Sequence, residues 1–154
     1  MIVVGLGGNV GDVRARFERA REALGARRSA RLYRSAPIGP AQADFLNSAV
    51  ALDEDWLPQE LAALIGEIEQ QLGRRRAEET RWGPRTLDLD VLVWGARVLR
   101  EPLEVPHPRL VDRRFALAPL VDLVGDDFVV PGAGRAGELL ARVGGQAVVD
   151  LGTW

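Results

Sequence analysis

The fold and the candidate site both depend on the segment Arg81-Trp-Gly-Pro-Arg-Thr-Leu-Asp-Leu-Asp-Val-Leu-Val-Trp94. Most of residues 86–94 are β-branched or large and apolar, which predicts a strand that is largely buried. Alternate side chains of a strand share a face, so Asp88 and Asp90 point the same way and lie about 7 Å apart. Charge on a buried strand is costly unless something compensates it, and a divalent metal ion would do so. The alternative is an aspartate pair on a solvated face of the sheet.

Three further strands and two helices are predicted upstream of this strand. Their apolar periodicities and flanking turn residues, such as Asp12 before one helix and Gly25 after it, indicate where they begin and end. The order β-α-β-β-α-β is typical of an α+β, ferredoxin-like fold, with a mainly antiparallel sheet and both helices packed on one face. The expected strands are 1–6, 30–35, 45–52 and 86–94, and the expected helices are 13–24 and 58–72.

The pattern is looser after Trp94. An extended segment is expected at 105–109, and short helical turns interrupted by Pro119 are expected between 112 and 123. Residues 128–130 and 148–151 are predicted to pair as a small hairpin. These pieces form a C-terminal extension, and a length of 154 residues suits a single domain, 1–154.

Composition excludes several kinds of chemistry. The chain has no cysteine and no lysine, so disulfides, thiolate chemistry, the Walker A lysine and Schiff bases are excluded. His107 is its only histidine, which excludes multi-histidine metal sites. A metal ion would be held by oxygen, which favours magnesium, manganese or calcium.

Charge and hydropathy bear on partners and location. The net charge of -2 provides no general attraction for nucleic acid. No apolar run reaches the roughly 18 residues of a membrane span, and no leader segment is evident. A cytoplasmic protein with no membrane or nucleic-acid partner is expected.

Arginines concentrate in the segment just before the aspartates. Five of them, including Arg74 and Arg85, fall between residues 74 and 85. Beside a magnesium site they would suit a polyphosphate, which guanidinium groups clamp and metal ions bridge. The alternative is a solvated basic loop that forms ion pairs with Glu78 and Glu79.

Other candidates are weaker on their own. Phe45, Asn47 and Phe115 would suit a flat heterocycle, although core packing is the alternative for both phenylalanines. His107 is also compatible with a structural or surface role. The glycine-rich run 5–11 lacks the G-x-G-x-x-G spacing and is interpreted as a turn that ends the first strand.

Taken together, these motifs resemble the 6-hydroxymethyl-7,8-dihydropterin pyrophosphokinase family of folate biosynthesis. The resemblance covers almost the whole chain from Gly5 onward. It implies transfer of a pyrophosphoryl group from ATP to the hydroxymethyl oxygen of the dihydropterin, with release of AMP. The strings that carry it are 81–92, Val105-Pro-His-Pro-Arg-Leu110, Arg113-Arg-Phe-Ala-Leu-Ala-Pro-Leu120, Gly39-Pro40 and Phe45-Leu-Asn47.

The resemblance also implies roles for individual residues. Asp88 and Asp90 would hold two Mg²⁺ ions, and Arg74 and Arg85 would contact the phosphates during catalysis. A monomer that binds only small molecules, ATP and the dihydropterin, is implied. Nucleotide binding is implied for His107, Arg113, Arg74, Arg85 and Trp82, and pterin binding for Phe45, Asn47, Phe115, Gln42, Ala36, Ile38 and Glu69.

Two functions of other classes compete with this one. Ferredoxin-like domains often bind RNA through aromatic residues on the sheet, but the expected strand 1–6 has no aromatic residue. A regulatory domain that binds nucleotide without turnover is the second. Retention of both aspartates and the loop arginines favours an enzyme instead.

Overall fold

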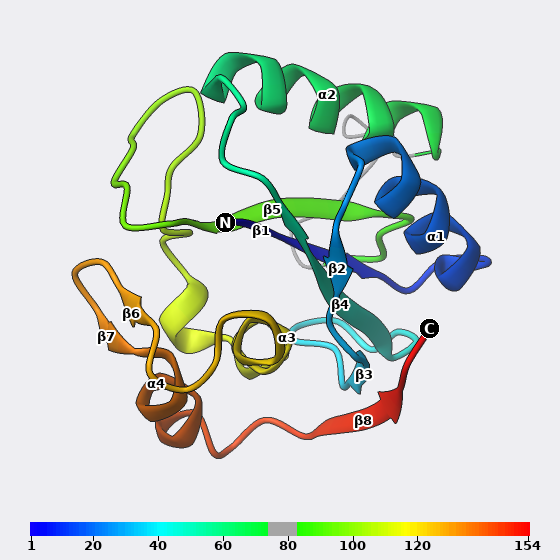
Figure 1. Ribbon diagram of the computed structural model, residues 1–154. Coiled ribbons are helices and arrows are strands. Elements are labelled where there is room, and N and C mark those ends of the chain that lie inside the picture. Colours follow the sequence, from blue (N-terminus) through cyan, green and yellow to red (C-terminus); the bar gives the residue numbers. More distant parts are fainter. Residues whose placement is uncertain (74–82) are drawn as a thin grey trace.

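The computed structural model describes residues 1–73 and 83–154 of the chain (Figure 1). Arg74 and Trp82 belong to the segment 74–82, so the roles predicted for them lie outside the described residues. Within the described part, no helix combines the length and the apolar character needed to cross a membrane.

An antiparallel sheet forms the centre of the fold (Figure 1). The strand order is β5-β1-β4-β3-β8, and the short strand β2 also pairs with β4. The expected fourth strand, β5, therefore lies next to β1, as the ferredoxin-like arrangement requires. The strands are β1 (Ile2–Gly8), β2 (Arg28–Ser29), β3 (Leu32–Ser35), β4 (Phe45–Leu52), β5 (Asp88–Trp94) and β8 (Val148–Gly152).

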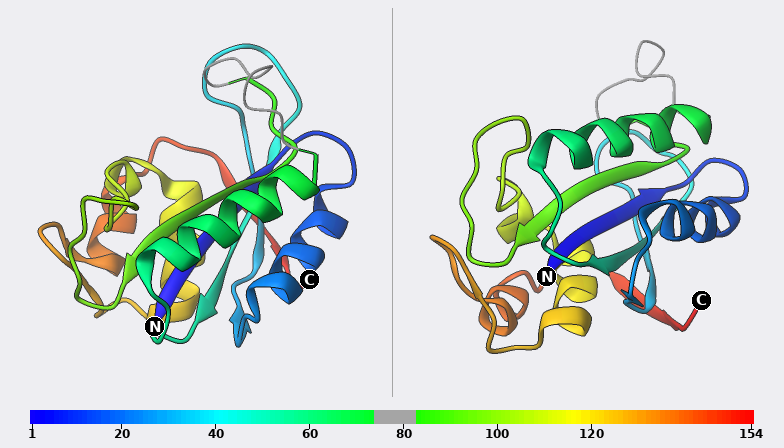
Figure 2. Two further views of the ribbon diagram at one scale, coloured as in Figure 1. Left: turned by 90° about the horizontal axis from the view of Figure 1, so that it is seen from above. Right: turned by 45° about the horizontal axis from the view of Figure 1, so that its top comes forward.

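Helices α1 (Val13–Leu24) and α2 (Pro58–Gln71) pack on one face of the sheet (Figure 2). The carboxylate of Asp12 accepts a hydrogen bond from the Ala15 amide at the start of α1, and Gly25 ends this helix in the left-handed conformation, with φ 64°. Apolar residues on one side of each helix pack against the sheet and form a first core with it. This core includes Phe17 of α1, Leu61 of α2 and Trp94 of β5. The predicted placement of both helices on one face is confirmed.

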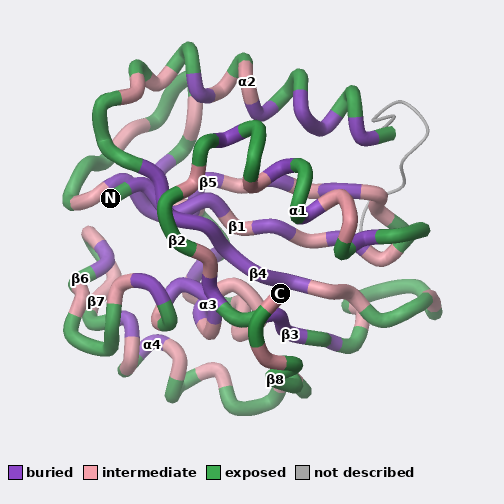
Figure 3. Tube along the Cα trace, turned by 45° about the vertical axis from the view of Figure 1, so that its right-hand side comes forward, coloured by how far each residue is buried: buried purple, intermediate pink, exposed green. Residues whose placement is uncertain are grey.

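The opposite face of the sheet is covered by the C-terminal extension. Helix α3 (Arg114–Val124) lies on β4, where the small side chains of Ala49 and Ala51 leave room for it. Buried residues therefore run along the middle of the sheet, as Figure 3 shows. The remaining elements are η2 (Leu110–Asp112), α4 (Ala136–Arg142), β6 (Val129–Val130) and β7 (Gly134–Arg135).

Two predictions for the C-terminal extension were wrong. Pro119 does not interrupt α3, because apolar packing of this helix against the sheet outweighs the single backbone hydrogen bond that proline removes. Residues 128–130 and 148–151 do not pair with each other. Val129–Val130 instead turns back onto Gly134–Arg135, and β8 extends the sheet by pairing with the edge of β3.

Three strands also differ from their predicted extents, and one of them, β5, begins at Asp88, two residues later than expected. The strand expected at 30–35 begins only at Leu32, and a separate short strand, β2, precedes it at Arg28–Ser29. The register against β4 shifts by one residue between Ser29 and Tyr33. The Ser48 hydroxyl donates to the carbonyl of Arg31 at this bulge, at 2.9 Å. The strand expected to end at Leu6 continues to Gly8, so the start of the glycine-rich run is strand and not turn.

Removal of the Phe17 side chain tests this description of the first core. Because the ring is fully buried between α1 and the sheet, Phe17→Ala should lower the free energy of unfolding by about 3–5 kcal/mol in urea denaturation. Val98→Ala is the control, since Val98 is 67% exposed and its loss should change stability by less than about 0.5 kcal/mol. Equal stabilities of the two variants would contradict the placement of Phe17.

Candidate active site

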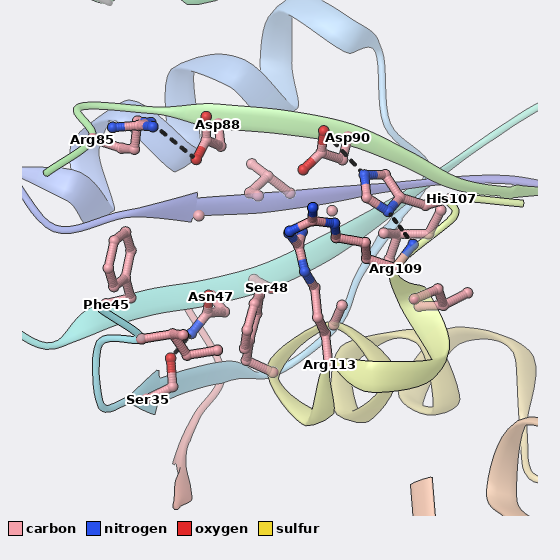
Figure 4. Close-up of a pocket in the computed structure, with 18 of the residues that line it drawn as sticks. Ser35, Phe45, Asn47, Ser48, Arg85, Asp88, Asp90, His107, Arg109 and Arg113 are labelled. Carbon is pink, nitrogen blue, oxygen red and sulfur yellow. Dashed lines mark hydrogen bonds and ion pairs between the residues drawn. The ribbon is translucent and has the colours of Figure 1, made fainter. Parts of the chain in front are cut away.

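A cavity of about 500 Å³ opens on the face of the sheet that carries α3 (Figure 4). Its volume is in the range that small-molecule sites occupy. Strands β1, β4 and β5, the loop after β3 and the start of α3 all contribute to its wall. It brings together most of the residues singled out in the sequence, namely Ala36, Ile38, Phe45, Asn47, Arg85, Asp88, Asp90, His107, Arg113 and Phe115.

Two glycines form the floor of this cavity. In the register of the sheet, Gly7 lies between Asp88 on β5 and Asn47 on β4, and Gly5 lies beside Asp90. Because Gly7 has no side chain, the space above β1 stays open between Asp88 and Asn47. A Cβ at Gly5 would lie 3.2 Å from the Leu92 side chain, so glycine there makes room for Leu92. Sequence analysis missed this role, although alternate glycines within a strand can mark a close approach to a ligand.

The two aspartates can serve as ligands for a magnesium ion. Their side chains are 32% and 47% exposed, and both line the cavity. No group of three or more His, Asp or Glu side chains suited to a metal ion occurs among the described residues. Magnesium is commonly held by one or two carboxylates together with substrate phosphates and water. Asp88 and Asp90 fit that type of site and do not form a closed metal cage.

His107 is held beside Asp90 by the backbone that follows β5. Its amide donates to the Leu92 carbonyl at 2.9 Å, and its Nδ1 accepts from the Arg109 amide at 3.2 Å. The neutral ring therefore carries its proton on Nε2, which lies 3.8 Å from Oδ1 of Asp90. Burial lowers the pKa of His107, an effect that Asp90 partly opposes, and the ring can act as a neutral hydrogen-bond donor.

Three arginines line the cavity, Arg85, Arg109 and Arg113, and two of them, Arg85 and Arg113, reach it from opposite sides (Figure 4). The Nε atom of Arg85 lies 4.0 Å from Oδ2 of Asp88, and its Nη1 donates to the carbonyls of Gly83 and Pro84. Arg113 extends from the start of α3, with its guanidinium carbon 5.6 Å from the centre of the Phe115 ring. Burial lowers the pKa of Arg113, but an arginine remains charged at neutral pH. Both groups can bind phosphate oxygens.

The other end of the cavity is suited to a flat polar ring. The Asn47 side chain, only 4% exposed, donates from Nδ2 to the Ser35 hydroxyl at 2.8 Å, which fixes the orientation of the amide. Phe45 and Phe115 line the cavity from β4 and α3. Ser35 was missed in the sequence because only the pairing of β3 with β4 brings it near Asn47.

Two predicted pterin-binding residues are not among those that line the cavity. Gln42 accepts a hydrogen bond from Asn9 at 2.9 Å and donates to the Pro40 carbonyl. Glu69 is 2% exposed on α2, where its carboxylate accepts from the Leu89 amide of β5 at 3.1 Å. Their roles in substrate binding stay predictions.

Asn9 connects two segments that line the cavity, and sequence analysis missed it. The backbone N–H of Asn9 donates to the Arg85 carbonyl, and the side-chain Oδ1 of Asn9 accepts from the backbone N–H of Arg85, each at 2.9 Å. Its Nδ2 donates to the Gln42 side chain and to the Ala43 carbonyl, both at 2.9 Å. The backbone of Arg85 and the loop 36–44 are therefore held by a single side chain.

Known proteins are similar to this chain over most of its length. A family profile described as "7,8-dihydro-6-hydroxymethylpterin-pyrophosphokinase (HPPK)" matches residues 3–125. A Synechocystis protein named 2-amino-4-hydroxy-6-hydroxymethyldihydropteridine pyrophosphokinase is 41% identical over 140 residues, which are 86% of this chain and 70% of that protein. A Methylorubrum extorquens protein of the same name is 40% identical over 148 residues, 91% of each chain.

A plant relative is much longer than this chain. The "Folate synthesis bifunctional protein, mitochondrial" of Pisum sativum is 38% identical over 165 residues. The match takes in 96% of this chain but only 32% of the plant protein. The similarity is therefore confined to about a third of that bifunctional protein.

Asn9→Ala tests the connection between Arg85 and the loop 36–44. It removes three side-chain hydrogen bonds, so the free energy of unfolding should fall by about 1–3 kcal/mol in urea denaturation. Asn9→Asp retains the acceptor for the Arg85 amide but loses both donated hydrogen bonds. Its free energy of unfolding should lie between those of the wild type and Asn9→Ala. Wild-type stability of Asn9→Ala would show that these contacts contribute nothing.

Proposed function

Because the chain belongs to the 7,8-dihydro-6-hydroxymethylpterin-pyrophosphokinase family, we propose that it transfers pyrophosphate from ATP to 6-hydroxymethyl-7,8-dihydropterin. The acceptor is the hydroxymethyl oxygen, and AMP is the leaving group. The enzyme is thus an ATP-dependent diphosphokinase of folate biosynthesis. The observation that carries this function is the glycine-floored cavity, with paired carboxylates at one end and an oriented amide at the other.

The dimensions of the sheet suit a reaction between two bound substrates. Asp88, Gly7 and Asn47 are neighbours on three adjacent strands, so the first and third backbones lie about 10 Å apart. A pterin at Asn47 and phosphates at Asp88 would then be side by side. Phosphoryl-type transfer depends mainly on alignment and charge stabilisation, for which this arrangement needs no strong base.

Each part of the cavity has a proposed role. Two Mg²⁺ ions, held by Asp88 and Asp90, would supply the positive charge that offsets the phosphates. Arg85 and Arg113 would bind phosphate oxygens, and the Nε2–H of His107 would donate to the nucleotide. Phe45 and Phe115 would stack on the pterin, whose edge would bond to Asn47. Further pterin contacts are proposed for Ala36, Ile38, Gln42 and Glu69, and nucleotide contacts for Arg74 and Trp82, which lie outside the described residues.

An RNA-binding role is not supported by the fold. RNA-binding domains of this topology use the sheet face that their two helices leave open. Here α3 and other parts of the C-terminal extension pack on that face, and the lining of the cavity that remains includes Asp88, Asp90 and Asp112. Carboxylates would repel a nucleic-acid backbone unless metal ions intervened.

The wider setting is proposed as well. A monomeric enzyme with one domain, 1–154, is proposed from the length of the sequence. A cytoplasmic location is proposed from the sequence, while the name of the pea relative places that protein in mitochondria. ATP is the co-substrate in this family, and small molecules are the partners the cavity can hold.

Product analysis tests the proposed activity directly. The full chain would be incubated with Mg²⁺, ATP and 6-hydroxymethyl-7,8-dihydropterin, and nucleotides would be separated by chromatography. AMP and the pterin diphosphate should form in equal amounts, and no AMP should form without the pterin. ADP as the sole nucleotide product would show that the pyrophosphoryl assignment is wrong.

Asp90→Asn tests the metal site. Loss of one anionic ligand should lower turnover by about two to three orders of magnitude, because phosphate charge is less well stabilised. Circular dichroism should show an unchanged fold. Asp55→Asn is the matched control, since Asp55 is exposed in the loop between β4 and α2 and should keep full activity. Wild-type turnover of Asp90→Asn at saturating Mg²⁺ would remove the metal hypothesis.

A further inference from the structure

The start of α3 carries three residues that line the cavity, Arg113, Phe115 and Ala116, but no side-chain cap of its own. Arg113 occupies the N-cap position, and its side chain makes no capping hydrogen bond. The first amides of a helix lack partners within the helix, so they need one from elsewhere. Arg113 and Phe115, on either side of the Arg114 amide, both line the cavity. A group that binds the Arg114 amide therefore also helps to fix the backbone positions of Arg113 and Phe115.

Gln146 supplies the missing partner from a distant part of the chain. Its Oε1 accepts from the Arg114 amide at 3.0 Å, and its Nε2 donates to the Asp112 carbonyl at 3.0 Å. One side-chain amide therefore binds the backbone on both sides of Arg113. The Arg114 guanidinium adds a longer contact, 3.5 Å, to the Val143 carbonyl.

The segment that carries Gln146 is held at both of its ends. It leaves α4, which packs against α3, and enters β8, which pairs with β3 as part of the sheet. Gln146 thus ties the start of α3 to a segment that is fixed to the rest of the protein. It lies outside the cavity lining and beyond residues 3–125, the part that the family profile matches.

The consequence concerns the position of Arg113. Figure 4 shows this side chain extending from α3 toward Asp90, across the cavity from Phe45 and Asn47. A displacement of its backbone would move the guanidinium away from the phosphate end. The same displacement would shift the Phe115 ring, because only one residue separates the two positions.

We propose that Gln146 is a positioning residue for substrate binding, which holds Arg113 and Phe115 in place through the backbone of residues 112–114. It touches neither substrate itself. The inference rests on the proposed function, in which Arg113 binds phosphate and Phe115 stacks on the pterin. The competing role is purely structural, with Gln146 only anchoring the segment before β8.

Gln146→Met in the full chain separates the two roles. Methionine keeps the length of the side chain but loses both hydrogen bonds. KM for ATP and KM for the pterin should each rise about three- to tenfold, the scale expected for a lost hydrogen bond or two, while kcat changes less than about twofold. Gln146→Glu retains only the acceptor for the Arg114 amide and should give an intermediate rise. Gln59→Met, at an exposed position in the first turn of α2, should match the wild type.

Hydrogen exchange gives a readout that needs no catalysis. The amides of residues 112–117 should exchange faster in Gln146→Met than in the wild type. Unchanged KM values in an active variant would overturn the positioning role, whether or not the melting temperature falls. If the wild type formed no AMP, the proposed function would be wrong. The inference would then be decided by calorimetry with ATP, where equal Kd values for wild type and Gln146→Met would overturn it.

Discussion

The site depends on one constraint, the register of β1 between β4 and β5. Because strand side chains alternate between faces, a slip of one residue in β5 would turn Asp88 and Asp90 into the first core and bring Leu89 into the cavity. The observed register places both carboxylates opposite glycines, and Asp88 in line with Asn47 across Gly7. Apolar burial enforces it, since Leu87, Leu89 and Val91 all belong to the first core.

The cavity exists because the second face of the sheet is covered only in part. Helix α3 packs where β4 has the small residues Ala49 and Ala51, while Gly7 leaves open space further along the sheet. Charges of both signs line the opening, so the partly buried carboxylates face guanidinium groups across it. An anionic ligand with bound cations would complement both sets at once.

Local signals account for the elements that were predicted well. Helix α1 was predicted at its observed bounds because Asp12 caps it and Gly25 ends it. Strand β4 was also predicted at its observed bounds, from its apolar residues and flanking turns. The failures came where distant contacts decide. Helix α3 continues past Pro119 because it packs against the sheet. Strand β8 pairs with β3 because that edge of β3 has no other strand beside it in the described part of the chain.

The sequence by itself determined the chemistry that is available to this protein and the family to which it belongs. The chain has no cysteine, no lysine and one histidine, so a metal ion would have to be bound by oxygen ligands. The paired aspartates can provide these ligands, and the many arginines can bind phosphate. Only the tertiary structure decided which distant groups form hydrogen bonds: Asn9 with Arg85, Asn47 with Ser35, and Gln146 with the backbone next to Arg113. Such hydrogen bonds require a fit of about 3 Å between groups far apart in the chain, which no local pattern of residues encodes.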